Sequence, residues 1–110
     1  MLWIANFNIQ RNKMQEFQAH VKETEKALAE LAPPGWKFKG TYIYVLGFGP
    51  YHGMSIWEAT DYGDLDAFRE HEDPEWQKLV AQFLSFTTSD PTPNWLLREV
   101  GDTKITEPDS

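Results

Sequence analysis

The sequence predicts a single α+β domain with the order strand, helix, strand, strand, helix, strand. Three observations lead to this prediction: short runs rich in β-branched and aromatic residues, two stretches whose apolar side chains recur at helical spacing, and Pro- and Gly-containing clusters between them. The chain has 110 residues, of which 41% are hydrophobic and 15% aromatic. This length suits one domain, and this composition can build an apolar core, so we expect most of the chain to fold.

The first strand and the longer helix are predicted in the N-terminal third. Residues 2–9, LWIANFNI, form an apolar and aromatic run whose odd-numbered side chains would face one side of a sheet and even-numbered ones the other. From Asn12 apolar residues recur in alternating steps of three and four, which is typical of an amphipathic helix. The residues of this helical face are Met14, Phe17, Val21, Thr24, Leu28 and Leu31. Asn12 is predicted to cap the helix, and Pro-Pro-Gly at residues 33–35 to end it.

Two further strands are predicted to form a hairpin. Residues 36–48 are rich in β-branched and aromatic side chains, and residues 52–60 follow after a connection short enough for an antiparallel hairpin. Within residues 36–48, uninterrupted alternation places the following side chains on a common side of the sheet: Trp36, Phe38, Tyr42, Tyr44, Leu46 and Phe48. Ile43 and Val45 would then lie on the opposite side. Within residues 52–60, the alternation places Met54 and Ile56 on one side of the sheet and Trp57 and Ala59 on the other.

The C-terminal half supplies the second helical region and the last strand. Asp64 is predicted to cap a short helix. Asp73-Pro74-Glu75 repeats the signals of a helix start, so the second helical region should be bent or broken at Pro74. The apolar face after this break comprises Trp76, Leu79, Val80 and Phe83. NWLLREV at residues 94–100 predicts the fourth strand.

Charge and composition disfavour several classes of function. The chain has no Cys, which removes disulfides, thiolate metal sites and cysteine nucleophiles, and its formal net charge is −7. Residues 58–75 contain eight carboxylates and one Arg, which would repel a phosphate backbone. No apolar run reaches the ~18 residues of a membrane span, and the first residues do not resemble a secretion signal. We therefore expect a cytoplasmic protein without nucleic-acid or membrane partners, with residues 1–101 as its domain and residues 102–110 as a flexible acidic tail.

One side of the predicted sheet needs a cover. The order of elements gives the split βαβ arrangement of ferredoxin-like domains, in which a four-stranded antiparallel sheet carries two helices on one face. Apolar and aromatic residues nevertheless fall on both sides of the predicted strands. Leaving several of them in water would forgo roughly 1.5 to 3 kcal/mol each. A second copy of the same sheet is the simplest cover, so we expect a homodimer.

The segment GPYHGMSIWEATDYGDLDAFREHEDPEW, from Gly49 to Trp76, and this order of elements resemble the dimeric α/β-barrel superfamily. A strand ending in Ile-Trp-Glu, then Asp-Leu-x-Ala-Phe and Asp-Pro-Glu-Trp, most resembles its NIPSNAP and antibiotic-biosynthesis-monooxygenase branches. The resemblance covers about residues 2–100 in layout. It implies that two sheets pair into a barrel and that a ligand lies between the sheet and the helices of each subunit. The activities that it implies include cofactor-independent oxygenation, haem degradation, and isomerisation or dehalogenation of small aromatics, and some members have no known activity.

Haem and metal chemistry are disfavoured. The haem-degrading branch uses an Asn on the first strand with a Trp and a His on the second helix, but matching the two patterns puts His71 at the Trp position and Ala81 at the His position. His-Glu-Asp-Pro-Glu at residues 71–75 superficially resembles a zinc-protease helix, yet its fifth residue is Glu and Pro74 interrupts the helix. We therefore expect neither a metal nor another cofactor. We interpret the acidic segment as a solvated surface, and the alternative is a hard cation held by oxygen ligands among Glu58, Asp61, Asp64 and Asp66.

Two histidines are the candidate catalytic residues. His20 lies close to the apolar stripe of the first helix, where its side chain could reach a gap between helix and sheet, and His71 precedes the break at Pro74. An imidazole with a pKa near 6.5 can act as a general base for a phenolic or acidic C–H proton at neutral pH. The alternative for His20 is a histidine at the rim of the fold, hydrogen-bonded to a neighbour. His52 begins a strand and is interpreted as a surface turn residue.

Polar groups on the strands and two tryptophans are the candidate ligand-binding residues. The polar residues with apolar neighbours are Asn6, Asn8, Tyr42, Tyr44, Glu58 and Arg98. On the helix side of the sheet they would supply the few orienting hydrogen bonds of a small-molecule site, and otherwise the Tyr and Arg residues would lie at sheet edges or the dimer rim. Trp57 and Trp76 are core or interface residues by default and can also stack on an aromatic ligand.

Two functions follow from these observations. The first is a small cofactor-independent enzyme, similar to monooxygenases or isomerases, in which His20 or His71 removes a proton from a small apolar or aromatic molecule while Asn6 or Tyr44 stabilises the developing oxyanion. The second is a non-catalytic ligand-binding or assembly module of the same fold. The fold alone does not choose between them, so the volume and lining of the space between helices and sheet must decide.

Overall fold

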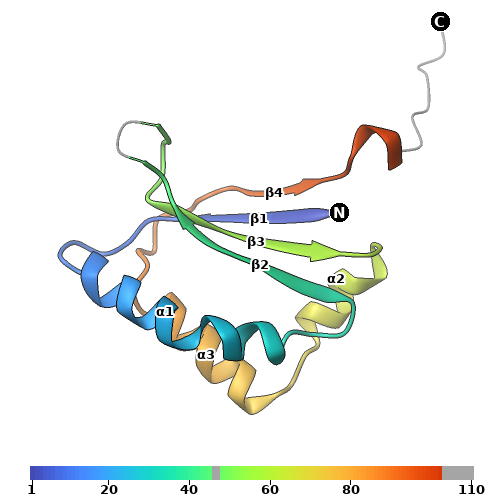
Figure 1. Cartoon of the computed structure of the whole chain (residues 1–110), viewed down its shortest axis with the longest axis horizontal. Helices are drawn as coiled ribbons and strands as arrows, with labels where there is room; N and C mark the ends of the chain where they lie inside the picture. Colours follow the sequence, from blue (N-terminus) through green and yellow to red (C-terminus); the bar gives the residue numbers. More distant parts are fainter. Residues whose placement is uncertain (46–47, 103–110) are drawn as a thin grey trace, which may run out of the picture.

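The structure is a computed structural model that describes residues 1–45 and 48–102. The strands are β1 (Leu2–Phe7), β2 (Trp36–Ile43), β3 (Gly53–Ala59) and β4 (Asn94–Leu97), and they form one antiparallel sheet in the order β2-β3-β1-β4. The helices are α1 (Met14–Glu30), α2 (Gly63–Arg69) and α3 (Pro74–Leu84), with a 3-10 turn at Val100–Asp102. Figure 1 shows the helices on one side of the sheet. This is the predicted ferredoxin-like α+β fold.

The strands are shorter than predicted. β1 ends at Phe7, and Ile9 rejoins the sheet only through an isolated bridge to Thr87. β4 ends at Leu97 because β1, its partner, begins at Leu2, the residue opposite. β2 ends at Ile43, and residues 46–47 of the longer predicted strand lie outside the described residues. Residues 103–110 of the expected tail lie outside them as well.

Asn12 does not cap α1, so that prediction is wrong. The N-cap residue is Lys13, whose side chain makes no capping hydrogen bond, and Asn12 has a φ of 65°. Asn adopts this left-handed conformation more readily than most residues do. Asn12 therefore turns the chain from β1 into the helix rather than capping it.

The second helical region is broken at Pro74 as predicted. The prediction that Asp64 caps the short helix α2 is wrong, because the N-cap residue is Tyr62. Asp64 lies inside α2, and its carboxylate reaches back to accept hydrogen bonds from the backbone N–H groups of Thr60 and Asp61. Asp73 does cap α3, since its carboxylate accepts from the backbone N–H groups of Glu75 and Trp76. The two carboxylates differ because Pro74 fixes the start of α3, whereas no proline fixes the start of α2.

A β-bulge in β2 reverses part of the predicted face pattern. Phe38 pairs with Trp57, whereas Gly40 pairs with Ile56, so Lys39 is an extra residue in β2. Gly40 has a φ of 129°, a conformation that a residue with a Cβ rarely adopts.

Beyond the bulge the alternation is shifted by one residue. Thr41 pairs with Ser55, and their hydroxyls lie 3.2 Å apart on the helix side of the sheet. Tyr42 and Tyr44 consequently lie on the face opposite Trp36. The predicted common side for these three residues is wrong, because an unbroken period of two cannot reveal a bulge.

Aromatic residues form the core between sheet and helices. One cluster is centred on Trp36, Trp57 and Trp76, and a second on Phe7 and Phe17. Trp57 and Trp76 meet edge to face with ring centroids 5.4 Å apart, and Phe7 and Phe17 have centroids 5.4 Å apart. Each such side chain contributes roughly 1.5 to 3 kcal/mol through burial. The core therefore lies on the helix side of the sheet, where it positions the site described below.

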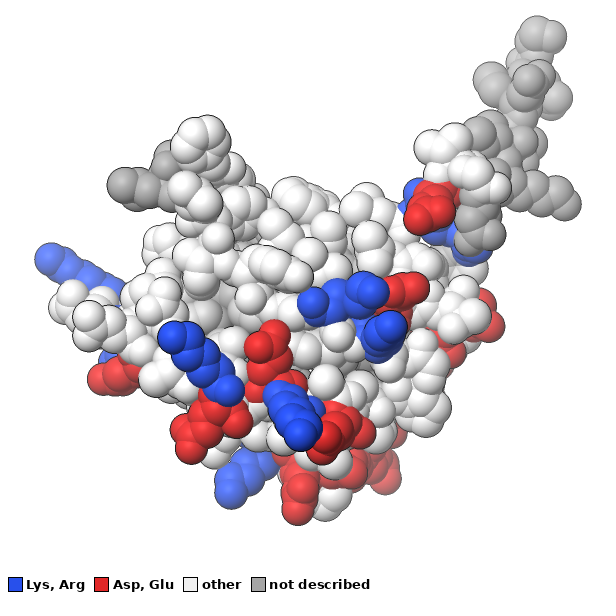
Figure 2. All heavy atoms as spheres, viewed as in Figure 1, with Lys and Arg blue, Asp and Glu red and all other residues white. Residues whose placement is uncertain are grey.

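The other face of the sheet, here called the outer face, is also apolar. Residues that pair across neighbouring strands share a face, and the register assigns to the outer face the apolar or aromatic residues Leu2, Ile4, Tyr42, Met54, Ile56, Trp95 and Leu97, together with Asn6, Lys37 and Glu58. Trp95 is 40% and Leu97 45% exposed in the single chain. Figure 2 shows charged side chains gathered mainly over the helices, while most of the surface above them is uncharged. The outer face is thus a largely apolar surface, with Lys37 and Glu58 on its β2–β3 side, and no described residue of this chain covers it.

Two further properties concern the described residues alone. No helix among them is both long and apolar enough to cross a membrane. No three of their His, Asp and Glu side chains come together in a group that could hold a metal ion.

Candidate functional site

A cavity of about 370 Å³ lies between the sheet and the helices, and we call it the main cavity. Its walls come from β1, β3, α1, α2, α3 and the segment that leads into β4. This volume falls at the lower end of the ~300 to 1,000 Å³ range of ligand-binding pockets. The space is therefore large enough for a small organic molecule.

Aromatic residues from three elements form the apolar wall of the main cavity. Trp57 comes from β3, Phe68 from α2 and Trp76 from α3. Phe68 packs edge to face against both tryptophans, with centroid distances of 5.6 Å to Trp57 and 5.5 Å to Trp76. These contacts hold the three rings in fixed orientations, so this wall of the cavity is apolar and preorganised.

Polar residues line the side of the main cavity where β1 and β4 separate. The two strands pair as far as Ala5 and Asn94, and the chain rejoins β1 only where the backbone N–H of Thr88 donates to the carbonyl of Asn8. Between these points Thr92 Oγ1 donates to the carbonyl of Asn6. The intervening residues form a polar rim over the apolar wall.

Asn94 is the polar side chain of this rim with the greatest freedom to bind a ligand. It is exposed, and its amide makes no side-chain hydrogen bond within the part of the chain that the structure describes. Asn8 Oδ1 accepts from the backbone N–H of His52, and Thr87 Oγ1 donates to the carbonyl of Leu84, whereas the Thr88 hydroxyl is buried and has no hydrogen-bond partner among the described residues. A ligand can therefore hydrogen-bond to Asn94 without displacing a bond within the protein.

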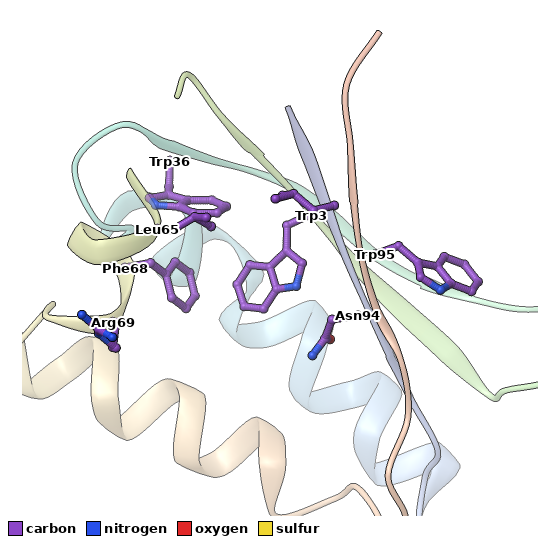
Figure 3. Close-up of a pocket in the computed structure, with 8 residues that line it drawn as sticks. Trp3, Trp36, Leu65, Phe68, Arg69, Asn94 and Trp95 are labelled. Atoms are coloured by element: carbon purple, nitrogen blue, oxygen red, sulfur yellow. The ribbon is translucent and has the colours of Figure 1, made fainter. Parts of the chain in front are cut away.

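A second, smaller cavity of about 230 Å³, here called the side cavity, adjoins the main one. Its lining residues, shown in Figure 3, are Trp3, Trp36, Leu65, Phe68, Arg69, Asn94, Trp95 and Leu96. The indole nitrogen of Trp36 donates to the carbonyl of Asp64 at 2.6 Å, which ties this wall to α2. Arg69 is exposed and paired with Asp66 at 3.1 Å.

Four of the seven predicted ligand-binding residues line the main cavity. These are Asn6, Asn8, Trp57 and Trp76. Asn6 is also buried on the outer side of β1, where its Oδ1 accepts from the Tyr44 hydroxyl at 2.9 Å and its Nδ2 donates to the carbonyl of Pro93.

The other three predicted ligand-binding residues lie away from both cavities. Tyr42 and Tyr44 are on the outer face because of the bulge in β2. The Arg98 guanidinium lies over the ring of Tyr62, 5.3 Å from its centroid. Glu58, the remaining polar strand residue, pairs with Lys39 at 3.1 Å, and this hydrogen bond and charge hold the pKa of the Glu58 carboxyl below its usual value.

The candidate catalytic histidines do not line either cavity. The ring of His20 packs against Phe86 with centroids 5.2 Å apart. His71 Nε2 lies 2.9 Å from the carbonyl of Leu31, to which it donates, and the His71 ring is 5.6 Å from that of Trp76. His20 lies on α1 and His71 in the loop between α2 and α3, and the two imidazoles are not brought together. His52 Nδ1 accepts from the backbone N–H of Ile9 at 2.8 Å.

Sequence reasoning missed Asn94 and the threonines of the rim. Thr87, Thr88 and Thr92 precede the predicted fourth strand, and the sequence pattern assigns no role to them. Nothing in the local pattern shows that this segment leaves the sheet beside β1. One sequence signal points to Asn94: it is the first residue of the predicted fourth strand and alternates with Trp95. A Trp95 side chain on the outer face therefore places Asn94 on the helix side.

Thr88→Val is expected to stabilise the protein by about 1 kcal/mol. Thr88 Oγ1 is buried and has no hydrogen-bond partner among the described residues, and valine has the same shape without the hydroxyl. Urea unfolding of the variant and of the parent measures the difference. Thr92→Val is the matched control, because the Thr92 hydroxyl makes a hydrogen bond to Asn6, and it should lose stability. A loss of stability in Thr88→Val would show that its hydroxyl is paired.

Comparison with known proteins identifies the fold. No protein-family model and no curated protein matches the chain. Among solved structures, a NIPSNAP-like domain protein from Burkholderia xenovorans is 18% identical with a TM-score of 0.68, over 97% of this chain and 90% of that one. A second NIPSNAP domain protein from that organism is 16% identical with a TM-score of 0.65, over 90% of this chain and 95% of that one.

A NIPSNAP family protein from Agrobacterium tumefaciens is 20% identical with a TM-score of 0.59, over 90% of this chain and 86% of that one. The chain therefore has the fold of NIPSNAP domain proteins across almost its whole length. This confirms the resemblance seen in the sequence at the level of fold. Identities this low do not transfer a ligand or an activity.

Proposed function

We propose that this protein is a homodimer in which each subunit binds a small, uncharged and largely apolar or aromatic molecule in the main cavity. The observation that carries the proposal is the lining of that cavity. Aromatic and aliphatic side chains form its wall, and the polar side chains among its lining residues are Asn, Ser and Thr, which can form hydrogen bonds but carry no charge.

An uncharged ligand matches this lining better than an ion does. A carboxylate or ammonium group would lose its hydration on entering and would meet no opposite charge among the lining residues, which is costly. A hydroxyl or carbonyl group instead needs one or two hydrogen bonds, and the Asn94 amide offers both a donor and an acceptor at the rim. The proposed ligand thus has an apolar body against Trp57 and Trp76 and one polar group near Asn94.

Binding is proposed in preference to acid–base catalysis. General-base catalysis requires the base within about 2.6 to 3.2 Å of the proton that it removes, or one water away. His20 and His71 line neither cavity, and the Nε2 of His71 is already bonded to the carbonyl of Leu31. The predicted role of these histidines as bases has no support from their positions.

A matched pair of probes tests the proposal. Calorimetric titration should show 4-propylphenol binding at least about 10-fold more tightly than 4-propylbenzoate, which has a similar shape and a negative charge. Asn94→Ala should weaken the phenol severalfold without changing the unfolding midpoint, because Asn94 is exposed and makes no side-chain hydrogen bond among the described residues. Equal affinities for the two probes, or no binding of either, would refute the proposed ligand class.

The outer face supports a second copy of this chain as the partner. Seven apolar or aromatic residues cover most of it, with Asn6, Lys37 and Glu58 beside them, and a largely apolar face can be complementary to itself across a two-fold axis. Charges elsewhere on the chain sum to −7 and oppose association, but they are gathered mainly over the helices, on the other side of the molecule. Packing of two outer faces keeps these charges apart. The sequence resemblance to proteins that pair their sheets supports the same arrangement.

A further inference from the structure

The main cavity and the side cavity share part of their walls. Trp3 and Phe68 border both of them, as does Asn94 at the rim. Beyond these shared residues, the main cavity extends along β1 towards Phe7 and Phe83, while the side cavity extends towards Trp36 and Leu65. The two spaces are therefore neighbours with a common boundary.

The boundary is a contact between two aromatic rings. The rings of Trp3 and Phe68 meet edge to face, with centroids 4.8 Å apart and planes at 86°. Figure 3 shows both side chains reaching into the space between sheet and helices from opposite sides, Trp3 from β1 and Phe68 from α2. At this distance the two rings are in van der Waals contact.

Both rings are held in place by neighbours. Trp3 contacts Trp36 at a centroid distance of 5.7 Å, and Phe68 contacts Trp36 at 5.0 Å and Trp57 at 5.6 Å. A ligand cannot displace either ring without breaking several aromatic contacts. The boundary is consequently a rigid wall and not a mobile side chain.

We propose that the Trp3–Phe68 pair is the specificity-determining partition of the binding site and sets the longest apolar ligand that the main cavity accepts. The inference rests on the proposed function. The side cavity lies directly behind the partition and is lined mostly by apolar residues, with Arg69 and Asn94 as its polar ones, so it would receive the extension of a longer ligand once the partition is opened.

The proposal predicts a chain-length limit. Each methylene that a ligand buries raises affinity roughly fourfold, so affinity should climb along a series of 4-alkylphenols and stop climbing when the chain reaches the partition. Titrating the wild-type protein with the ethyl to nonyl members of this series locates the limit. In Trp3→Leu and in Phe68→Leu the limit should move to chains at least two methylenes longer, with the longest chains gaining about 10-fold or more over wild type.

Two variants of Leu65 identify where the chain goes. Leu65→Trp introduces a ring into the side cavity, and in the Trp3→Leu background it should restore the wild-type limit. Leu65→Ala enlarges the side cavity without touching the partition and should leave the limit unchanged. Phe68→Leu is the milder truncation, and its unfolding midpoint together with that of Trp3→Leu shows that the variants are folded.

The outcomes separate the two proposals. If the wild-type protein binds no 4-alkylphenol, the proposed function fails and the inference falls with it. If the wild-type protein binds them without a limit, or with a limit that neither Trp3→Leu nor Phe68→Leu moves, the partition is refuted and the proposed function stands. If the limit moves but Leu65→Trp does not restore it, the chain extends elsewhere and the role of the side cavity is refuted.

Discussion

Replacing Ile56 by glutamate is expected to convert a dimer into a monomer. Ile56 lies on the outer face, opposite Ile4 of β1, in the middle strands of the sheet. In a dimer joined by two outer faces, each copy would bury a carboxylate in an apolar interface, which should weaken association by at least about 100-fold. Size-exclusion chromatography with light scattering should give twice the subunit mass of 12.8 kDa for the parent and the subunit mass for the variant.

The matched control is Gln18→Glu, which adds the same charge on the exposed side of α1. This variant should remain dimeric, because α1 lies on the other side of the sheet. The free subunit of Ile56→Glu should also show higher exposure of apolar surface, measured with a hydrophobic dye. A parent that is already monomeric at micromolar concentration, or a variant that dimerises as well as the parent does, would contradict the proposed assembly.

The fold was predictable because its strongest signals are local. The spacing of apolar residues in α1 depends only on neighbouring residues, and the break between α2 and α3 follows from Asp73 and Pro74 alone. The bulge at Lys39 has no comparable local signal. A glycine inside a strand, such as Gly40, is compatible with a bulge but also with a regular position beside a large side chain. Only the pairing with β3 reveals the register shift.

The candidate site was predictable only in part because it depends on contacts between distant residues. Asn6, Asn8 and Trp57 lie on strands with clear patterns, and each lines the main cavity. Tyr44 was expected beside them and instead lies on the outer face, since one extra residue in β2 moves every later side chain to the opposite face. The opening between β1 and the segment before β4 depends on a hydrogen bond between Thr88 and Asn8, 80 residues apart in their numbering. No local pattern contains that information.

Trp57→Ala is expected to lower the free energy of unfolding by about 3 to 5 kcal/mol, the usual range for removing a large buried aromatic side chain. Trp57 is 5% exposed and contacts the rings of Phe38, Phe68 and Trp76, with centroids 4.5, 5.6 and 5.4 Å away. Folded domains are stabilised by only about 5 to 15 kcal/mol, so the unfolding midpoint should fall by about 10 °C or more. Thermal and urea unfolding measure both quantities.

The control separates the loss of packing from the loss of an aromatic residue as such. Phe48→Ala removes a ring that is 82% exposed, and its effect should stay within about 0.5 kcal/mol. Trp57→Phe should be intermediate in stability, because it keeps one ring against Trp76, and it should still alter 4-propylphenol affinity, because the same indole forms both the core and the cavity wall. If Trp57→Ala is as stable as Phe48→Ala, the indole does not hold α2 and α3 against the sheet, and the cavity between them does not have the walls described above.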